Sequence, residues 1–312
     1  MRQISGTISI GKFEFEFAHE IRIRSSWKHL TDTASIALPR ALKWKDQYLK
    51  DEIKKGDQVR IELGYDFEDQ LEFSGYVSEV KSGVPTLIEC EDEMWTLKQS
   101  NITKTYRSVK LQQLLQDIIP ENIKFNAVQA DLGPFRINKV SPAKVLDEIK
   151  KKYGIVSFFR AGVLVVGFPY SQVERDNYEY QFEKDIISDR LLYKKQDDIK
   201  VTVRAVSMLP GGKTITEKVG DPDGELHSLH FYNLSQSQLV KSAKEEMARL
   251  RFEGYRGGFN TFGIPHVKHS DQVTLKSYEY PERDGSYLVD EIDVYWGVNG
   301  YRRSIVLGPK SA

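Results

Sequence analysis

The sequence contains a single cysteine among 312 residues, which excludes an internal disulfide. This residue, Cys90, lies between Glu89 and Glu91, and the neighbouring negative charges would raise the pKa of its thiol and disfavour a nucleophile. We therefore interpret Cys90 as a small strand residue.

A net charge is also lacking, because Lys+Arg and Asp+Glu both number 45. This balance argues against a strongly basic nucleic-acid binder. No run approaches the roughly 18 apolar residues of a membrane span. The first residues alternate in polarity instead of forming the apolar core of a signal peptide. These absences predict a protein kept in a reducing compartment and not inserted into a membrane.

The common motifs of catalysis and nucleotide binding are absent: there is no nucleophile elbow, phosphate loop or dinucleotide fingerprint. A zinc site needs three or four convergent ligands. His227 and His230 would lie on opposite faces of one strand, and His266 and His269 lie near a loop without cysteines. Glycoside hydrolysis needs two carboxylates facing each other across a cleft, and the acidic residues fit outer strand faces and turns. No catalytic, cofactor-binding or metal-binding residue is predicted.

What the sequence does contain is a long internal match between residues 56–90 and 270–307. Each stretch opens a strand with Asp-Gln-Val, at Asp57 and at Asp271, and continues through a charged turn. An aromatic-led strand follows, with an acidic residue near its middle, Glu79 in the first stretch and Asp290 in the second. A third strand closes each stretch. We therefore expect two related β-domains.

The hydrophobic pattern predicts a mainly β protein with an α+β insert: two similar small β-barrels joined by an α/β module. Residues 1–105 contain about seven short alternating strands, which favour a closed barrel or sandwich. Residues 106–170 alternate between helical and strand patterns, with helices after Ser108 and Ser141. Residues 171–312 return to strands and carry one inserted helix, 235–251, capped by Ser235.

Two kinds of binding surface deserve a separate test. Basic and aromatic residues interleave in three short clusters, as they do in single-strand nucleic-acid binders. Each cluster is close to acidic residues, so we expect an interface or a solvated edge and no stable nucleic-acid binding. A glycan-binding β-domain would need tryptophans on one face, and the four tryptophans are scattered. The three clusters are Arg40/Lys43/Trp44/Lys45/Tyr48, Tyr255/Arg256 and Tyr301/Arg302/Arg303, and the tryptophans are Trp27, Trp44, Trp95 and Trp296.

The order of these parts resembles the phage late control protein D family, the baseplate hub of contractile tails, which is related to the hub part of type VI secretion VgrG spike proteins. The stretches that carry the resemblance are IRIRSSWKHLTDTASIALPR, GDQVRIELGYD, LEFSGYVSEV, SPAKVLDEIKKKYG, SFFRAGVLVV, GIPHVKHSDQVTL and SYLVDEIDVYWGVNGYRRSIVLG. They cover nearly the whole chain. Each motif is loose, and their order and spacing are more specific than any one of them.

The resemblance implies a structural, non-enzymatic hub of a phage tail or a related contractile injection system. Hubs of this family look like two barrels per chain, and they form homotrimers whose six barrels adapt a six-fold tail tube to a three-fold spike. Its partners would be the tail tube, other baseplate proteins and a spike. The spike is expected to be a separate protein, with no lysozyme-like domain attached, because this chain stops at Ala312. The expected location is the virion tail or baseplate, assembled in the bacterial cytoplasm.

Two roles follow for particular segments. Five apolar residues should fill the barrel interiors: Val59, Ile61, Leu63, Val273 and Leu275. The helix 235–251 should pack on a barrel flank or at a subunit contact. The alternatives to a hub are a baseplate-associated enzyme that degrades peptidoglycan, and a glycan-binding β-domain protein.

Overall fold

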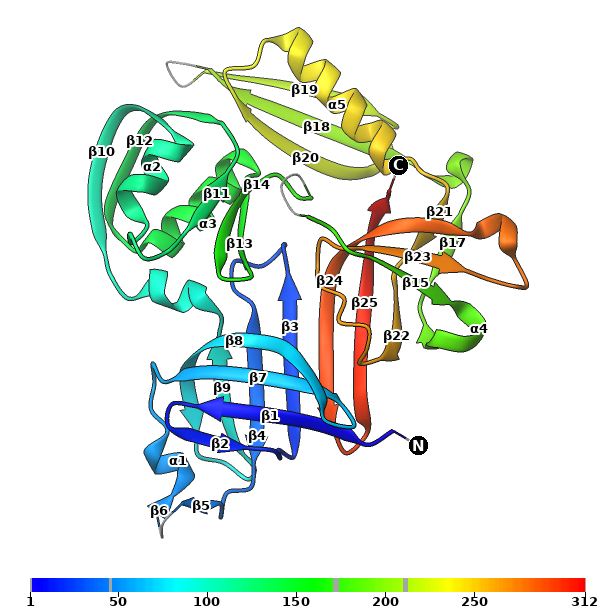
Figure 1. The fold of residues 1–312 in the computed structure, drawn as a ribbon. Helices are drawn as coiled ribbons and strands as arrows, with labels where there is room; N and C mark the ends of the chain where they lie inside the picture. The colour runs from blue at the N-terminus through cyan, green and yellow to red at the C-terminus, as the bar shows by residue number, and fades with distance from the viewer. Residues whose placement is uncertain (1, 45–46, 171–173, 210–212, 312) are drawn as a thin grey trace.

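A computed structural model describes residues 2–44, 47–170, 174–209 and 213–311. The protein is mostly β, with few helices, which confirms the predicted class (Figure 1). The first β-unit, called unit 1 below, has seven main strands and a small insertion of two short strands and one helical turn. Its strands are β1 (Ile4–Ile10), β2 (Phe13–Phe15), β3 (Glu20–Ser26), β4 (Thr33–Leu38), β7 (Gln58–Tyr65), β8 (Glu68–Lys81) and β9 (Thr86–Glu91), and the insertion is β5 (Lys43–Trp44), β6 (Gln47–Tyr48) and α1 (Leu49–Glu52).

The second β-unit, called unit 2 below, is built from strands that are widely spaced along the chain. They are β15 (Asn177–Gln181), β16 (Ile186–Asp189), β22 (Gly258–Phe262), β23 (Gln272–Lys276), β24 (Gly285–Gly297) and β25 (Gly300–Lys310). Two short elements, α4 (Phe182–Asp185) and η3 (Pro281–Arg283), connect some of them. A large insertion separates β16 from β22.

The two units have the same strand order. In unit 1 the neighbours run β1-β7-β8-β9-β4-β3, and in unit 2 they run β15-β23-β24-β25-β22-β16. Six strands therefore match one by one, both along the chain and across the sheet. All of these neighbouring strands are antiparallel, with one exception in unit 2. There β15 is parallel to β23, whereas β1 in unit 1 is antiparallel to β7. The predicted repeat at 56–90 and 270–307 is the three-strand half of this larger match.

The match extends to individual hydrogen bonds at the turn before β7 and β23. The amides of Gly56 and Ser270 donate to the carbonyls of Val77 and Val289 at 2.8 and 2.7 Å. Asp57 repeats the pattern of Asp271: each side chain accepts the amide of the lysine three residues earlier, at 2.8 Å in both units. Gly56 and Ser270 both have positive φ, 91° and 69°. Two turns this alike support the duplication predicted from the sequence.

The prediction of two separate closed barrels is corrected by the pairing between the units. β3 of unit 1 pairs with β24 of unit 2, from Ser26 opposite Glu291 to Glu20 opposite Gly297. Within the described residues, the strands of both units belong to one thirteen-stranded sheet that does not close. One continuous apolar core fills both units, because residues of both contact each other in it. The repeated units thus meet edge to edge instead of folding as isolated barrels.

Between the units in sequence lies a compact α/β module with its own core. It contains η1 (Glu93–Lys98), β10 (Ile102–Lys110), α2 (Leu111–Ile118), β11 (Phe125–Ala127), β12 (Asp131–Val140), α3 (Pro142–Tyr153), β13 (Val156–Arg160) and β14 (Val163–Gly167). Ser141 caps α3 by accepting the amide of Lys144 at 3.3 Å, and Gly154 ends it at φ 68°, as predicted. The first helix begins later than predicted, because Ser108 still belongs to β10.

The insertion in unit 2 is a small layer of one helix on one sheet. It comprises η2 (Gln196–Asp198), β18 (Val201–Met208), β19 (Thr214–Gly220), β20 (Glu225–Tyr232) and α5 (Gln236–Leu250). At its two ends, β17 (Leu192–Lys194) and β21 (Gly254–Arg256) pair with each other and continue the ladder of β16 and β22. Leu239 and Ala243 of α5 are buried against β18, in a separate core. The helix was predicted to pack on a barrel flank or a subunit contact; it packs on this sheet (Figure 1). The predicted boundaries at 105/106 and 170/171 remain a proposal.

Candidate functional site: the junction of the two β-units and the middle module

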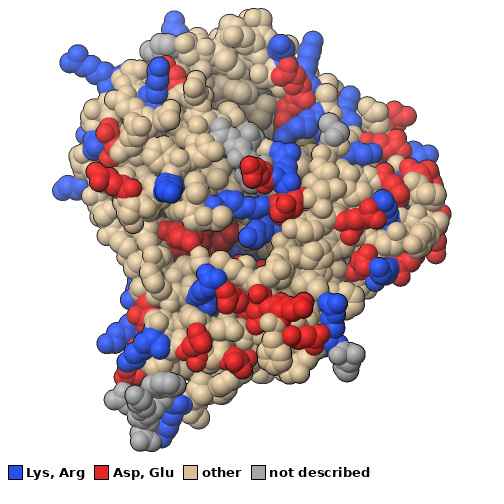
Figure 2. All heavy atoms as spheres, viewed as in Figure 1, with Lys and Arg blue, Asp and Glu red and all other residues tan. Residues whose placement is uncertain are grey.

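A cleft lies where both β-units meet the middle module. It has a volume of about 260 Å³, and residues of all three parts line it. Figure 2 shows acidic and basic side chains gathered in the hollow at the middle of this face. The charged residues of the lining are Asp32, Glu72, Asp92, Glu93, Arg160, Lys268 and Arg303. The junction therefore brings acidic and basic residues of all three parts together.

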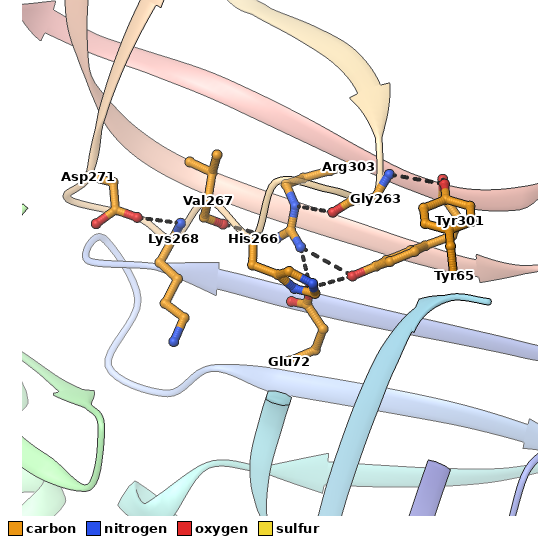
Figure 3. A network of polar contacts seen from close by, with 9 residues as sticks. All are labelled: Tyr65, Glu72, Gly263, His266, Val267, Lys268, Asp271, Tyr301 and Arg303. Atoms are coloured by element: carbon orange, nitrogen blue, oxygen red, sulfur yellow. Dashed lines mark hydrogen bonds and ion pairs between the residues drawn. The ribbon is translucent and has the colours of Figure 1, made fainter. Parts of the chain in front are cut away.

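A buried ion pair joins the units at the floor of this cleft (Figure 3). Glu72 of β8 accepts from the guanidinium of Arg303 and from the hydroxyl of Tyr301, both on β25. The side chains of Glu72 and Arg303 are 6% and 1% exposed. Arg303 also donates to the carbonyls of Gly263 and Val267, at 3.0 and 2.9 Å. A residue of unit 1 is thus held by residues of unit 2 in a site with little exposure to solvent.

Further contacts surround this pair. His266 Nδ1 lies 2.5 Å from a carboxylate oxygen of Glu72. The hydroxyl of Tyr65, on β7, donates to the carbonyl of Tyr301 at 2.9 Å, and the two rings are 5.5 Å apart. Burial alone would raise the pKa of Glu72, but the charge of Arg303 and the contact with His266 outweigh it and lower that pKa to about 2. The carboxylate is therefore charged at any physiological pH.

A pair of carboxyl groups lies on the unit 1 side of the cleft. The Asp32 side chain accepts from the Ser25 hydroxyl at 2.5 Å and from the Ser26 amide at 3.1 Å. Asp92 accepts from the amides of Asp32 and Met94, at 3.1 and 3.0 Å. Burial raises the pKa of Asp32 to about 6 and the pKa of Asp92 well above its usual range. Because these carboxyls are occupied by backbone and serine donors, they brace the ends of β3 and β9.

The middle module is fastened to unit 2 by Arg160, which lies at the end of β13. Its guanidinium is paired with the Asp271 carboxylate and donates to the carbonyl of His269 at 3.0 Å. His269 is 2% exposed and packs edge-on against Phe158, with ring centroids 4.7 Å apart. Burial, together with the charges of Arg160 and Lys268, lowers the pKa of His269 to about 3. The imidazole is therefore neutral and acts as an apolar contact between the parts.

The residues predicted to fill the β-unit interiors do so. Their exposures are between 0% and 3%, and they belong to the shared core: Val59, Ile61, Leu63, Val273 and Leu275.

The clusters predicted to be basic surface patches are partly buried. Tyr301 and Arg303 are buried in the junction, and Arg256 donates to the carbonyls of Leu250 and Phe252. Lys45 lies outside the described residues, as does the side chain of Trp44. That this protein does not bind nucleic acid stays a prediction.

The remaining tryptophans serve in packing. Trp296 donates to the carbonyl of Ser5 at 3.1 Å, from β24 across to β1. Trp27 donates to Asp290 at 3.1 Å, and Trp95 stacks on Tyr76 with ring centroids 5.0 Å apart. Among the described parts of the chain, no group of three or more His, Cys, Asp or Glu residues is placed to hold a metal ion. No helix there is long and apolar enough to cross a membrane. The prediction of no catalytic, cofactor or metal site is not tested by these contacts.

No family model and no curated protein matches the sequence. Solved structures do match its fold. A tail protein from Neisseria meningitidis MC58 has a TM-score of 0.68 at 14% identity, covering 99% of this chain and 97% of its own. The 43 kDa tail protein of prophage MuSo2 from Shewanella oneidensis has a TM-score of 0.63 at 16% identity, covering 97% of each chain.

A third structure connects the fold to secretion. It is an Escherichia coli component of the type VI secretion system, described as structurally similar to the T4 bacteriophage tail proteins gp27 and gp5. Its TM-score is 0.64 at 10% identity, over 97% of this chain and 77% of that one. This chain has the fold of phage tail proteins. The predicted resemblance to the hub and VgrG proteins is therefore confirmed at the level of the fold.

Proposed function

We propose that the protein is a structural, non-enzymatic baseplate hub of a phage tail or of a related contractile injection system. The observation that carries the proposal is the pair of matching six-strand units, which share one sheet through β3 and β24. Two copies of one unit in a chain give three chains six similar positions, which suits a connector between six-fold and three-fold structures. The tail proteins with the same fold support this choice over an enzyme.

The polar junction gives the hub its rigidity. A buried ion pair is costly to break, because removal of one partner leaves the other charge buried and unpaired. Glu72 and Arg303 lie between the units, and Arg160 and Asp271 lie between unit 2 and the middle module. A ring that transmits force needs parts that keep fixed angles. The chemistry of the cleft thus serves positioning, and its neighbours in the assembly would be the tail tube, a spike protein and other baseplate proteins.

Light scattering coupled to gel filtration, over a wide range of concentrations, tests this proposal. A three-chain mass that persists on dilution is expected, because an interface on the order of 2,000 Å² or more would hold each contact. A mass of one chain at every concentration would overturn the ring. A peptidoglycan zymogram tests the enzymatic alternative, and a cleared zone at the mass of this chain would support that alternative.

A further inference from the structure

Among the described residues, each unit has one unpaired strand edge whose counterpart in the other unit is paired. Those two counterparts pair with each other, where the units join. The outer edge of β3 in unit 1 pairs with β24 of unit 2. The counterpart of β24 is β8, and the edge in question is the end of β8 in unit 1. The counterpart of β3 is β16 together with its continuation into β17, the segment 188–194 in unit 2. Both have a ladder on one side only among the described residues. β3 and β24 lie between β8 and β17 in Figure 1, so the unpaired edges are separated.

The register of the repeat fixes which residues correspond. The matching turns align Val77 with Val289, as shown above. Each strand then bulges by one residue, so that Glu79 lies opposite Glu89 in unit 1, as Glu291 lies opposite Val306 in unit 2. Glu79 is therefore the counterpart of Glu291.

Following the paired residues from strand to strand across each sheet aligns β3 with the segment 188–194. Glu89 lies opposite Ser35, and Val306 lies opposite Gly258. Ser35 in turn lies opposite Arg22, while Gly258 accepts the amide of Arg190 at 2.8 Å. Arg24, which lies opposite Thr33, therefore corresponds to Leu192, which lies opposite Arg256. Two residues further on, Lys194 is the counterpart of Ser26.

We infer that the two unpaired edges join neighbouring copies of this chain, with Glu79 of one copy opposite Lys194 of the next. This pairing repeats between chains the pairing of Glu291 with Ser26 within one chain. The contact is head-to-tail, and such contacts close into a ring when the rotation between copies divides a full turn. The inference rests on the proposed hub function and names the surfaces that build its ring.

The side chains on the two edges fit this register. Val80 and Tyr193, which would face each other, both pack on the shared apolar core. Their neighbours along the strands face outward: Glu79 is 62% exposed, and Leu192 is 66% exposed. A slip by one residue would place outward side chains against the core. The charges of Glu79 and Lys194 are also opposite in sign, which favours a cross-strand pair.

Disulfide trapping tests the inference with the full chain. Residues directly opposite in an antiparallel pair have Cα atoms about 4.5–5.5 Å apart, within disulfide range. The double variant Glu79→Cys/Lys194→Cys, oxidised and run on a non-reducing gel, should give covalent dimers and trimers. Adding a reductant should return them to monomers. Glu291→Cys/Ser26→Cys is the positive control, because it should close within one chain. Glu79→Cys/Lys195→Cys is the slipped control and should stay largely monomeric.

The outcomes separate the two proposals. A three-chain mass by light scattering with no covalent dimer, while the positive control oxidises, would overturn this edge pairing and leave the ring intact. A single-chain mass with no covalent dimer would overturn both.

A charge exchange gives a readout that needs no disulfide: Glu79→Lys should shift the assembly midpoint about tenfold or more to higher concentration. Adding Lys194→Glu to the same chain should restore it, and failure to restore it would count against the register.

Discussion

Units 1 and 2 share a strand order and a turn, yet their corresponding residues lie in different surroundings. The turn before β7 is at the surface, where Lys55 is exposed. The same turn before β23 lies under the middle module, where His269, the counterpart of Lys55, is buried against Phe158. The backbone hydrogen bonds are nevertheless the same. The comparison teaches that the backbone pattern of the repeat is kept, while its side chains have been adapted to each unit's neighbours.

Removal of the ion pair between the units should have the largest effect on the free energy of unfolding. Arg303→Met removes the charge that compensates Glu72, and breaking a buried pair typically costs about 3–5 kcal/mol of the free energy of unfolding. Urea denaturation measures this loss. Arg302→Met is the matched control, because Arg302 is half-buried and stacks over Phe262 at 5.2 Å, and its loss should cost less than about 1 kcal/mol. Equal effects of the two variants would contradict the assigned role of Arg303.

The carboxyl pair at the cleft belongs to unit 1 alone, since the register places Pro309 of unit 2 at the position of Asp92. The folded-state pKa of Asp32, about 6, is above its ordinary value of 3.8, so the folded state binds the proton more tightly. Its stabilising contribution is full below about pH 4 and is lost as the pH rises through 6.

Asp32→Asn should therefore flatten the stability profile between about pH 4 and pH 6.5, measured by urea denaturation at several pH values. An unchanged slope in Asp32→Asn would show that the cleft carboxyl does not titrate as described.

The two aspartates of the repeated turn provide a direct comparison of the units. Asp271→Asn removes the charge paired with the Arg160 guanidinium, and that aspartate side chain is 1% exposed. Asp57→Asn weakens only the local turn. We expect losses of about 3 and about 1 kcal/mol in thermal or urea unfolding. Similar losses at both positions would mean that the middle module adds nothing to the turn of unit 2.

The smallest expected effect concerns the residue with positive φ. Gly56→Ser copies the residue of unit 2 into unit 1, at a φ of 91° and with Trp95 only 3.1 Å from the added Cβ. A loss of about 1–2 kcal/mol is expected, because a side chain disfavours this backbone region. The reverse variant, Ser270→Gly, should change stability by less than about 1 kcal/mol. A stabilised Gly56→Ser variant would contradict the strained turn.

Much of the repeat could be predicted from the sequence, because Asp-Gln-Val and the alternation that follows are local patterns. The sequence match pairs Glu79 with Asp290, one position off, whereas the alignment of Val77 with Val289 pairs it with Glu291. The preceding hairpin is shorter in unit 2, where Gln272 lies opposite Leu288, than in unit 1, where Gln58 lies opposite Tyr76. A change of length within a turn leaves no local signal of the register that follows it. The junction of β3 with β24 was also missed, since it joins residues far apart in sequence. Arg22 and Arg24 predict only a half-exposed strand.

The buried network was missed for a different reason. Tyr301, Arg302 and Arg303 were interpreted as a basic and aromatic surface cluster, although Arg303 lies at even spacing from the buried residues Tyr301, Ile305 and Leu307. Period-two spacing would have placed Arg303 inside the sheet and called for an acidic partner. Which acidic residue that is could not follow from the sequence, because Glu72 comes from the other unit. Alternation thus reveals a buried charge but not its partner.

Electron cryo-microscopy of the purified, assembled protein tests the central claim most directly. The account predicts a closed ring of six similar lobes around a channel, made from three chains, with β3–β24 contacts alternating with contacts between copies. Single-chain particles at every concentration, or a ring in which the two units of one chain occupy dissimilar positions, would contradict it.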